Sequence, residues 1–409
     1  MKNKQLYYKS QEYLNELCVN IVERSVGSRG NQKATKFFAK AIGALGWQIE
    51  MPEFKVLDWE DEGATLQKGG KKFKVQVSPY SPGCDLERIL IDANNIDELA
   101  ETNVKDKILL LHGEIAREQL MPKNFVFYNP ERHQKIITLL EEKQPAAIIT
   151  ATGKNAALAG GVYPFPMIED GDFDIPSVYM TEKEGRKLLS LTGKKIKLRS
   201  ISRRIPSTAH NVIARSGKPF NPGIVITAHI DAKKGSPGAI DNATGIVVLL
   251  LLAELLEGYK GENRIAIVAF NGEDYYSVPG QMNYITKNQG KFDEIGLNIN
   301  IDGAGYRKGK SQFSFYDLPE GIEKMIKNVI NKYEEIEEGP QWVQGDHSIF
   351  IQHGCPAIAI SSQWFIENID SQDITHTPKD NISIVDSYRL VEIAKALNDF
   401  IRKLPKVSK

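Results

Sequence analysis

The sequence predicts an α/β protein, with a mixed, mostly parallel central sheet flanked by helices and a second, β-rich domain inserted into the chain. Three observations support this fold class. A length of 409 residues corresponds to two or three domains of ordinary size. After Pro206, strand, loop and helix patterns alternate, which is typical of a parallel sheet covered on both faces. Before it, from about Glu60, short β-rich segments alternate with charged turns.

Two amphipathic stripes near the N-terminus predict two helices joined by a turn. Apolar residues recur at helical spacing in each stripe. The motif GSRG at 27–30 predicts the turn between them, and Gly46 ends the second helix. The first stripe is Leu14, Leu17 and Ile21, and the second is Phe38, Ile42 and Leu45.

The middle block is predicted to be a domain of its own. It contains one helical pattern, at 132–142, and β-rich segments at 72–77, 107–111 and 146–149. The basic run at 193–204 closes it and is interpreted as a solvated edge strand or linker rather than a polyanion site. We therefore predict an inserted domain at 59–204 within a discontinuous domain formed by 1–58 and 205–409.

The last two hundred residues predict the central sheet and its helices. The apolar stretch at 245–256 is about twelve residues long, so it predicts a buried helix rather than a membrane span of roughly 18–20 residues. Helical stripes predict further helices near 322–333 and at the C-terminal end, with a mobile lysine-containing tail after them. Strands are predicted at 224–228, 264–270, 297–301 and 357–361.

Composition excludes several classes of partner. The 52 Lys and Arg residues balance 52 Asp and Glu, so neither nucleic acid nor an anionic membrane is an expected partner. Three distant cysteines, Cys18, Cys84 and Cys355, cannot build a disulfide framework or a thiolate zinc site. Together with a polar N-terminal segment that lacks the apolar run of a secretory signal, they predict a cytoplasmic location. Oligomeric state is left open, a homo-oligomer included.

Metal-ligating residue types follow three of the predicted strands. His229 and Asp231 follow the first strand, Glu273 and Asp274 the second, and Asp302 the third. Carboxyl ends of parallel strands share one edge of a sheet, where ligands bind. Two more residues, Asp241 before the apolar helix and His376 before the last helix, complete the candidate set. So many carboxylates at one edge would repel each other unless cations compensated them, which predicts a metal site.

Imidazole and carboxylate ligands without thiolate favour zinc in a catalytic site, with cobalt or manganese as substitutes. If one carboxylate bridges two ions, five residues can give each ion three protein ligands and leave a shared position for the attacking water. A nearby carboxylate that binds no metal can then move the proton of that water, and Glu273 is the candidate. Its neighbour Asp274 faces another direction in extended chain and is the candidate ligand.

These residues resemble the co-catalytic di-zinc aminopeptidases, metallopeptidase family 28. The resemblance covers about 1–58 and 205–405. The motifs that carry it are His-x-Asp at 229–231, Asp-Asn-Ala-Thr-Gly at 241–245, Glu-Asp at 273–274, Asp-Gly at 302–303, Gly-Asp-His at 345–347 with Phe350, and His-Thr-x-x-Asp at 376–380. The middle block resembles a protease-associated domain, through Asn103–Leu111, Asp174–Tyr179 and Glu184-Gly185.

The resemblance implies a role for each residue. His229 and Asp302 would hold one zinc, Asp274 and His376 the other, and Asp241 would bridge them. Asp231 would assist catalysis by orienting His229 through its free ring nitrogen, and Glu273 would be the general acid and base. The implied fold is of the zinc-exopeptidase type, and the peptide bond from Asp241 to Asn242 would be cis.

Two features depart from the family pattern. Asp274 replaces the usual glutamate and is a shorter ligand. Several members support the oxyanion with a tyrosine, whereas this chain offers Trp342 and Gln344 near the Asp-His motif. Asp346 and His347 are expected to support the site or contact substrate.

The predicted activity is that of a zinc-dependent aminopeptidase acting on peptides with a free N-terminus, through a zinc-bridged water. One alternative is a glutaminyl-cyclase-like or other amide hydrolase that uses a single metal. A second is a catalytically inactive, receptor-like relative. Serine or cysteine hydrolysis lacks support, because there is no Gly-x-Ser-x-Gly motif and Cys355 is expected to be a buried core thiol.

Overall fold

A computed structural model of the chain describes residues 2–153, 166–216, 223–343, 345–369 and 371–407. It divides into two compact units. Unit 1 comprises Met1–Val56, Thr208–Asn368 and Ile374–Lys409, and unit 2 comprises Leu57–Ser207 and Ile369–Asp373. The boundaries near 56 and 208 fall within two long strands, β2 (Glu53–Lys68) and β9 (Lys195–His210).

Unit 1 is built on an eight-stranded sheet of order β1-β10-β12-β11-β13-β16-β14-β15. Its central strands β12, β11, β13 and β16 run parallel, whereas β1, β10 and β14 pair antiparallel with their inner neighbours. The predicted mixed, mostly parallel sheet is thereby confirmed. The strands are β1 (Gln48–Glu50), β10 (Val212–Arg215), β11 (Ile224–His229), β12 (Ile265–Phe270), β13 (Leu297–Ile301), β14 (Ser311–Tyr316), β15 (Ile336–Glu338) and β16 (Ala357–Ser362).

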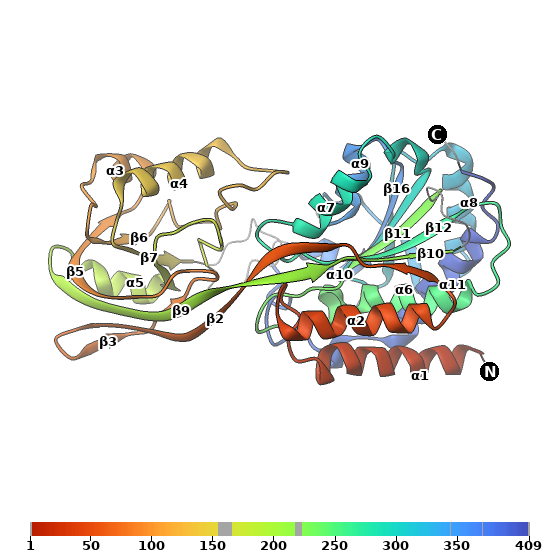
Figure 1. The fold of residues 1–409 in the computed structure, drawn as a ribbon, viewed down its shortest axis with the longest axis horizontal. Helices are drawn as coiled ribbons and strands as arrows, with labels where there is room; N and C mark the ends of the chain where they lie inside the picture. The colour runs from red at the N-terminus through yellow and green to blue at the C-terminus, as the bar shows by residue number, and fades with distance from the viewer. Residues whose placement is uncertain (1, 154–165, 217–222, 344, 370, 408–409) are drawn as a thin grey trace. The chain divides into compact units, whose positions relative to one another are not determined.

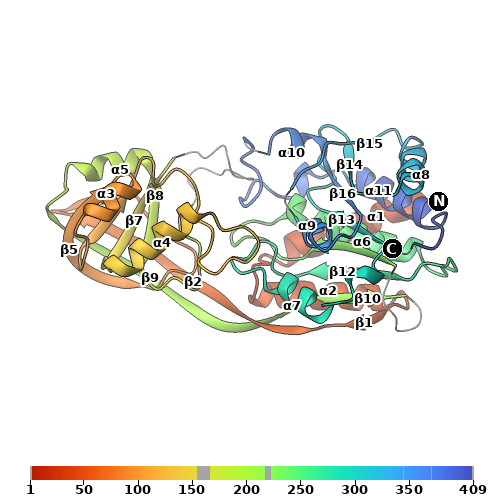
Figure 2. The ribbon, with the colours of Figure 1, turned by 90° about the horizontal axis from the view of Figure 1, so that it is seen from above.

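Helices cover both faces of this sheet, which is why its central strands are apolar along their whole length. Figure 1 shows α1, α2, α6 and α11 on one face and α7 and α9 on the other, and Figure 2 views these layers from the side of α9. The helices of unit 1 are α1 (Lys2–Asn15), α2 (Arg29–Gly43), α6 (Thr244–Leu255), α7 (Pro279–Lys287), α8 (Glu320–Ile330), α9 (His347–Gln352), α10 (Gln363–Glu367) and α11 (Ser387–Ile401).

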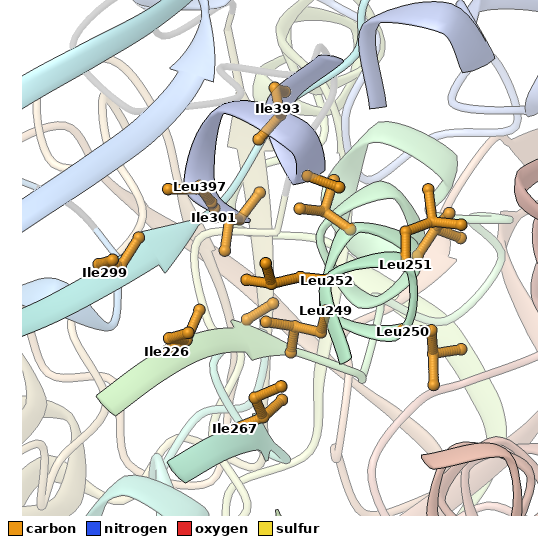
Figure 3. Packing of buried hydrophobic residues seen from close by; sticks show 14 of the residues in the cluster. Ile226, Leu249, Leu250, Leu251, Leu252, Ile267, Ile299, Ile301, Ile393 and Leu397 are labelled. Carbon is orange, nitrogen blue, oxygen red and sulfur yellow. The ribbon is translucent and has the colours of Figure 1, made fainter. Parts of the chain in front are cut away.

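Helix α6 is the centre of the core. It is buried from Thr244 to Ala253 because it packs against β11 on one side and against α1, α2 and α11 on others. A helix that is apolar all round is stable only in such a position. Figure 3 shows Leu249 and Leu252 of this helix facing the side of the strand residues Ile226 and Ile299, with the α11 residues Ile393 and Leu397 above them. The N-terminus of α6 is thus fixed beside the carboxyl ends of the strands.

Unit 2 has its own eight-stranded sheet, of order β3-β2-β9-β5-β6-β7-β8-β4. Residues of β6 alternate between two cores: Leu109 and Leu111 pack with α3 and α4, whereas Ile108 and Leu110 pack with α5. The other elements are β3 (Lys71–Phe73), β4 (Gln76–Val77), β5 (Cys84–Ala93), β6 (Ile108–Leu111), β7 (Ala147–Thr152), β8 (Ser177–Thr181), α3 (Ile96–Glu101), α4 (Glu131–Lys143) and α5 (Glu182–Leu189).

The prediction for GSRG at 27–30 is wrong in part. Only its first half is a turn, because Ser28 caps α2 by accepting a hydrogen bond from the amide of Asn31, and Arg29 and Gly30 are helical. Gly30 lies so close to the carbonyl of Glu23 that any side chain would collide with it.

Three further local predictions are wrong. The segment 72–77 is not one strand, because β3 pairs with β2 whereas β4 pairs with β8. The basic run is not at an edge, because β9 lies between β2 and β5 and buries alternate residues such as Ile196. The C-terminal segment is anchored, since Val407 is buried and donates a backbone hydrogen bond to Asn263 at 2.8 Å.

Within the described part of the chain, no helix is both long and apolar enough to cross a membrane. Cys355 is a buried thiol, as predicted. Its Sγ donates to the carbonyl of Phe292.

Candidate metal centre

The candidate ligands come from three neighbouring strands of unit 1. His229 is the last residue of β11, Glu273 and Asp274 follow β12, and Asp302 follows β13. Because β12, β11 and β13 are adjacent and parallel, these side chains start from the same edge of the sheet. Asp241 lies on the short turn η2 (Ala239–Ala243) that leads into α6.

His229 is surrounded by carboxylates. Its Nε2 lies 3.1 Å from Asp241 Oδ1, 3.6 Å from Asp302 Oδ1 and 4.0 Å from Glu273 Oε2. The imidazole is only 1% exposed, yet neither ring nitrogen has a hydrogen-bond partner of acceptable geometry. Three carboxylates thus lie near Nε2, but none of them forms a hydrogen bond with it. Because buried polar atoms need a partner, this nitrogen is available to bind another group.

His376 forms a second group of ligand types on the other side of Asp241. Its Nε2 lies 3.1 Å from Asp241 Oδ2 and 3.0 Å from Asp274 Oδ1. The two oxygens of Asp241 therefore face different imidazoles. His376 adopts φ +60°, a left-handed conformation that is uncommon for residues with a side chain.

The donor set fits divalent cations. One ligand atom from each of His229, Asp241 and Asp274 can be chosen so that all lie within 4.8 Å of one another. Burial raises the pKa of Asp302, and the nearby charges of Asp241 and Asp274 raise it further, although His229 opposes this. Burial lowers the pKa of His229, but the surrounding carboxylates hold that pKa well above its usual value. Cations would relieve this crowding of negative charge.

Glu273 differs from the other acids. Its nearest imidazole nitrogen is 4.0 Å away, and its side chain keeps 28% of its surface exposed. The pKa of Glu273 is raised well above its usual value, chiefly by burial and then by the charges of Asp302, Asp274 and Asp346, with His229 opposing. A carboxylate with a raised pKa at the edge of such a site is suited to accept and return a proton.

Asp231 does not form the hydrogen bond that was expected of it. The distance from His229 Nδ1 to Asp231 Oδ1 is 3.7 Å, which is too long for a hydrogen bond. The fully buried carboxylate instead accepts three backbone N–H groups, from Gly272 at 2.8 Å, Glu273 at 3.3 Å and Asp274 at 2.9 Å. Asp231 therefore fixes the loop that carries the candidate base and one candidate ligand.

Asp231→Asn is expected to lower the free energy of unfolding by about 1–3 kcal/mol, the cost of leaving a buried donor without an acceptor. The NH2 group of asparagine cannot accept a hydrogen bond, so at least one loop N–H group loses its acceptor. Chemical denaturation of the metal-free protein measures this change. The matched control is Asp386→Asn at the partly exposed N-cap of α11, where asparagine caps equally well. Equal stability of the two variants would contradict the assigned role.

The peptide bond from Asp241 to Asn242 is cis, as predicted. Asn242 donates to the carbonyl of Ile301 at 2.8 Å and accepts from the amide of Gly245 at 3.0 Å. A side chain at Gly245 would collide with the Asn242 amide and the Ile301 carbonyl, which explains why glycine stands there. These contacts attach the turn that carries Asp241 to the end of β13.

The other candidates lie beside the centre in a buried polar group. Gln281 donates to Asp346 Oδ1 at 2.7 Å, and burial raises the pKa of Asp346 to about 7. His347 lies against the ring of Trp342 and is 3.0 Å from its carbonyl, and burial lowers the pKa of His347 to about 4. Trp342 Nε1 is buried without a hydrogen-bond partner among the described residues. Gln344 lies outside the described residues.

A buried amide network behind Glu273 was not predicted from the sequence. Asn271 and Asn31 exchange side-chain hydrogen bonds at 2.8 and 3.0 Å. Asn211 accepts from the backbone of Asn271 and donates to the carbonyl of Gly280. The N-terminal segment thus supports the loop of the candidate base, about 240 positions away in the chain.

Comparison with known families and sequences gives consistent results. Residues 211–401 match the model of peptidase family M28. The chain is 23% identical over 402 residues to aminopeptidase YwaD of Bacillus subtilis, covering 92% of this chain and 80% of that one. It is also 23% identical over 357 residues to leucine aminopeptidase 2 of Trichophyton rubrum, covering 82% and 67% of the two chains.

Solved structures share the fold. An aminopeptidase from Aneurinibacillus sp. strain AM-1 superposes with a TM-score of 0.74 at 19% identity, covering 100% of this chain and 96% of that one. A zinc aminopeptidase from Bacillus subtilis gives a TM-score of 0.74 at 19% identity, with coverage of 98% and 95%.

Proposed function

We propose that this chain, whose residues 211–401 match the model of peptidase family M28, is a metal-dependent aminopeptidase of that family that removes residues from the free N-terminus of peptides. One observation carries the proposal: the carboxylate of Asp241 faces His229 with one oxygen and His376 with the other, at 3.1 Å each. The aminopeptidase activity named for its relatives supports it.

The proposed cofactor is a pair of zinc ions. His229 and Asp302 would hold one ion, His376 and Asp274 the other, and Asp241 would bridge them. The distances of 3.6 Å from His229 to Asp302 and 3.0 Å from His376 to Asp274 support this division. Imidazole and carboxylate donors without thiolate are typical of catalytic zinc, and cobalt or manganese could replace it.

Bound zinc would supply Lewis-acid polarisation of the scissile carbonyl and would make the attacking water easier to deprotonate. Glu273 does the rest of the proton chemistry in this proposal. Its carboxylate accepts the proton as the water oxygen attacks the carbonyl carbon, and returns it to the leaving nitrogen as the C–N bond breaks. The loop contacts of Asp231 keep Glu273 in place throughout.

Trp342 is proposed to support the developing oxyanion. Its buried indole N–H lacks a partner in the described part of the chain. Tyr316 fixes the backbone of Trp342 by accepting from its N–H at 2.7 Å and donating to its carbonyl. A preorganised donor of this kind stabilises charge that develops only in the transition state.

Unit 2 is proposed to be a protease-associated-like domain at 59–204. The sequence phrases that carry the resemblance form structural elements here, because 103–111 includes β6, 174–179 leads into β8 and Glu184-Gly185 lies in α5. A cytoplasmic location is likewise a proposal. The thiols of Cys18, Cys84 and Cys355 support it, because none of them forms a disulfide and such a compartment keeps thiols reduced.

A peptide with a free N-terminus should be cleaved from that end, whereas its N-acetylated form should resist. Chelation should abolish cleavage, added zinc should restore it, and metal analysis should find two ions per chain. Release of N-terminal residues is followed by mass spectrometry, with Glu273→Gln as the control for contaminating peptidases. Equal cleavage of the two peptides would rule out an aminopeptidase, and cleavage that persists without metal would rule out the proposed cofactor.

A further inference from the structure

Arg24, between the first helical segment and α2, is a fully buried cation. Its side chain is 1% exposed and makes no ion pair within the described residues. A buried guanidinium is tolerated only when its N–H groups find acceptors. All oxygen acceptors of Arg24 are main-chain carbonyls: those of Leu17 at 2.8 Å, Ile230 at 2.9 Å, Pro237 at 2.7 Å and Gly238 at 2.7 Å.

Three of these carbonyls belong to the segment that carries candidate ligands. Ile230 directly follows His229, and Pro237 and Gly238 begin the turn 237–241, which overlaps the first residues of η2 and ends at Asp241. One planar guanidinium group therefore ties the end of β11 to the start of that turn. The backbone of Arg24 adds to this connection, because its carbonyl accepts from the amide of Ala232 at 3.3 Å.

Asp380 holds the same turn through its N–H groups. Its carboxylate accepts from the amides of Ile240 at 2.7 Å and Asp241 at 3.1 Å, and its own carbonyl accepts from the amide of Ala239. Asp380 is fully buried and follows His376 by four positions. The guanidinium of Arg24 thus binds the carbonyls at the start of the turn, and the carboxylate of Asp380 binds the N–H groups at its end.

We propose that Arg24 and Asp380 are positioning residues that set the affinity of the centre for zinc. By fixing the turn 237–241 from the carbonyl and the N–H side, they hold the carboxylate of Asp241 between His229 and His376. This inference rests on the proposed function. Residues that orient metal ligands in this way typically change metal affinity by about 10–100-fold when they are replaced.

The test uses Arg24→Lys and Asp380→Asn in the full chain. Lysine keeps the charge but cannot reach four diverging carbonyls, and asparagine keeps the volume but only one accepting oxygen. The zinc dissociation constant is measured on metal-free protein by competition with a chromophoric chelator, and we expect it to rise about 10–100-fold in both variants. The matched controls are Arg389→Lys and Asp399→Asn, whose side chains pair with Glu335 and Tyr333; their zinc affinity should match that of the wild type.

A merely structural role would lower the stability of the metal-free variants without moving the zinc dissociation constant. Values within twofold of the wild type in both variants would therefore overturn the inference. If Arg24→Lys does not fold, Asp380→Asn decides alone, and an unchanged constant there overturns it. A wild-type chain that binds no zinc would refute the proposed function as well, whereas zinc-binding variants with wild-type affinity would refute only this inference.

Discussion

Glu273→Gln is expected to lower kcat by roughly 10²–10⁴-fold while the metal content stays that of the wild type. Glutamine has the same shape but cannot accept the proton of the attacking water or return one to the leaving amine. Retention of metal is expected because the Glu273 carboxylate lies 4.0 Å from the nearest imidazole nitrogen, farther than any of the proposed ligands. Turnover on a free peptide at saturating concentration, with elemental analysis of the same sample, measures both quantities.

The matched control is Glu254→Gln on α6, whose side chain is 20% exposed and pairs with Lys9 away from the centre. It removes a glutamate of similar exposure and should leave kcat within about twofold of the wild type. Near-normal turnover in Glu273→Gln would remove that residue from proton transfer. Loss of metal from it would instead make Glu273 a ligand.

Asp241→Asn is expected to abolish activity by releasing metal. In asparagine, an NH2 group replaces one of the two carboxylate oxygens, and an NH2 group cannot bind a cation. The site also loses one negative charge. Removing one partner of a buried charge pair costs ~3–5 kcal/mol, which corresponds to a zinc affinity lower by roughly two to four orders of magnitude. Elemental analysis after dialysis and titration of zinc into metal-free protein measure the change.

Asp399→Asn on α11 is the control for the same chemical change outside the centre, and it should keep both metal and activity. Asp241→Asn protein that still carries two zinc ions after dialysis would contradict the bridging role. Loss of a single ion with residual activity would favour a working site with one metal, as in the single-metal alternative.

Local patterns in the sequence were sufficient for most of the elements of unit 1. The apolar runs near 224–229, 265–270 and 297–301 form β11, β12 and β13, because strands buried on both faces of a sheet are apolar throughout. The predictions that failed, such as the single strand at 72–77, required knowledge of the pairing partner. Partner choice depends on residues more than a hundred positions away, as in the pairing of β4 with β8.

The types of the candidate ligands and their common sheet edge were decided by the sequence itself, because polar residues directly after parallel strands must gather at one edge. Only the tertiary structure decided how they combine. It set the two oxygens of Asp241 against different imidazoles, turned Asp231 away from His229 toward the loop 272–274, and brought Arg24 beneath the turn 237–241. Periodicity reports which face of an element is buried. It carries no information about which distant backbone groups a buried charge will bind, because that depends on how the finished elements pack.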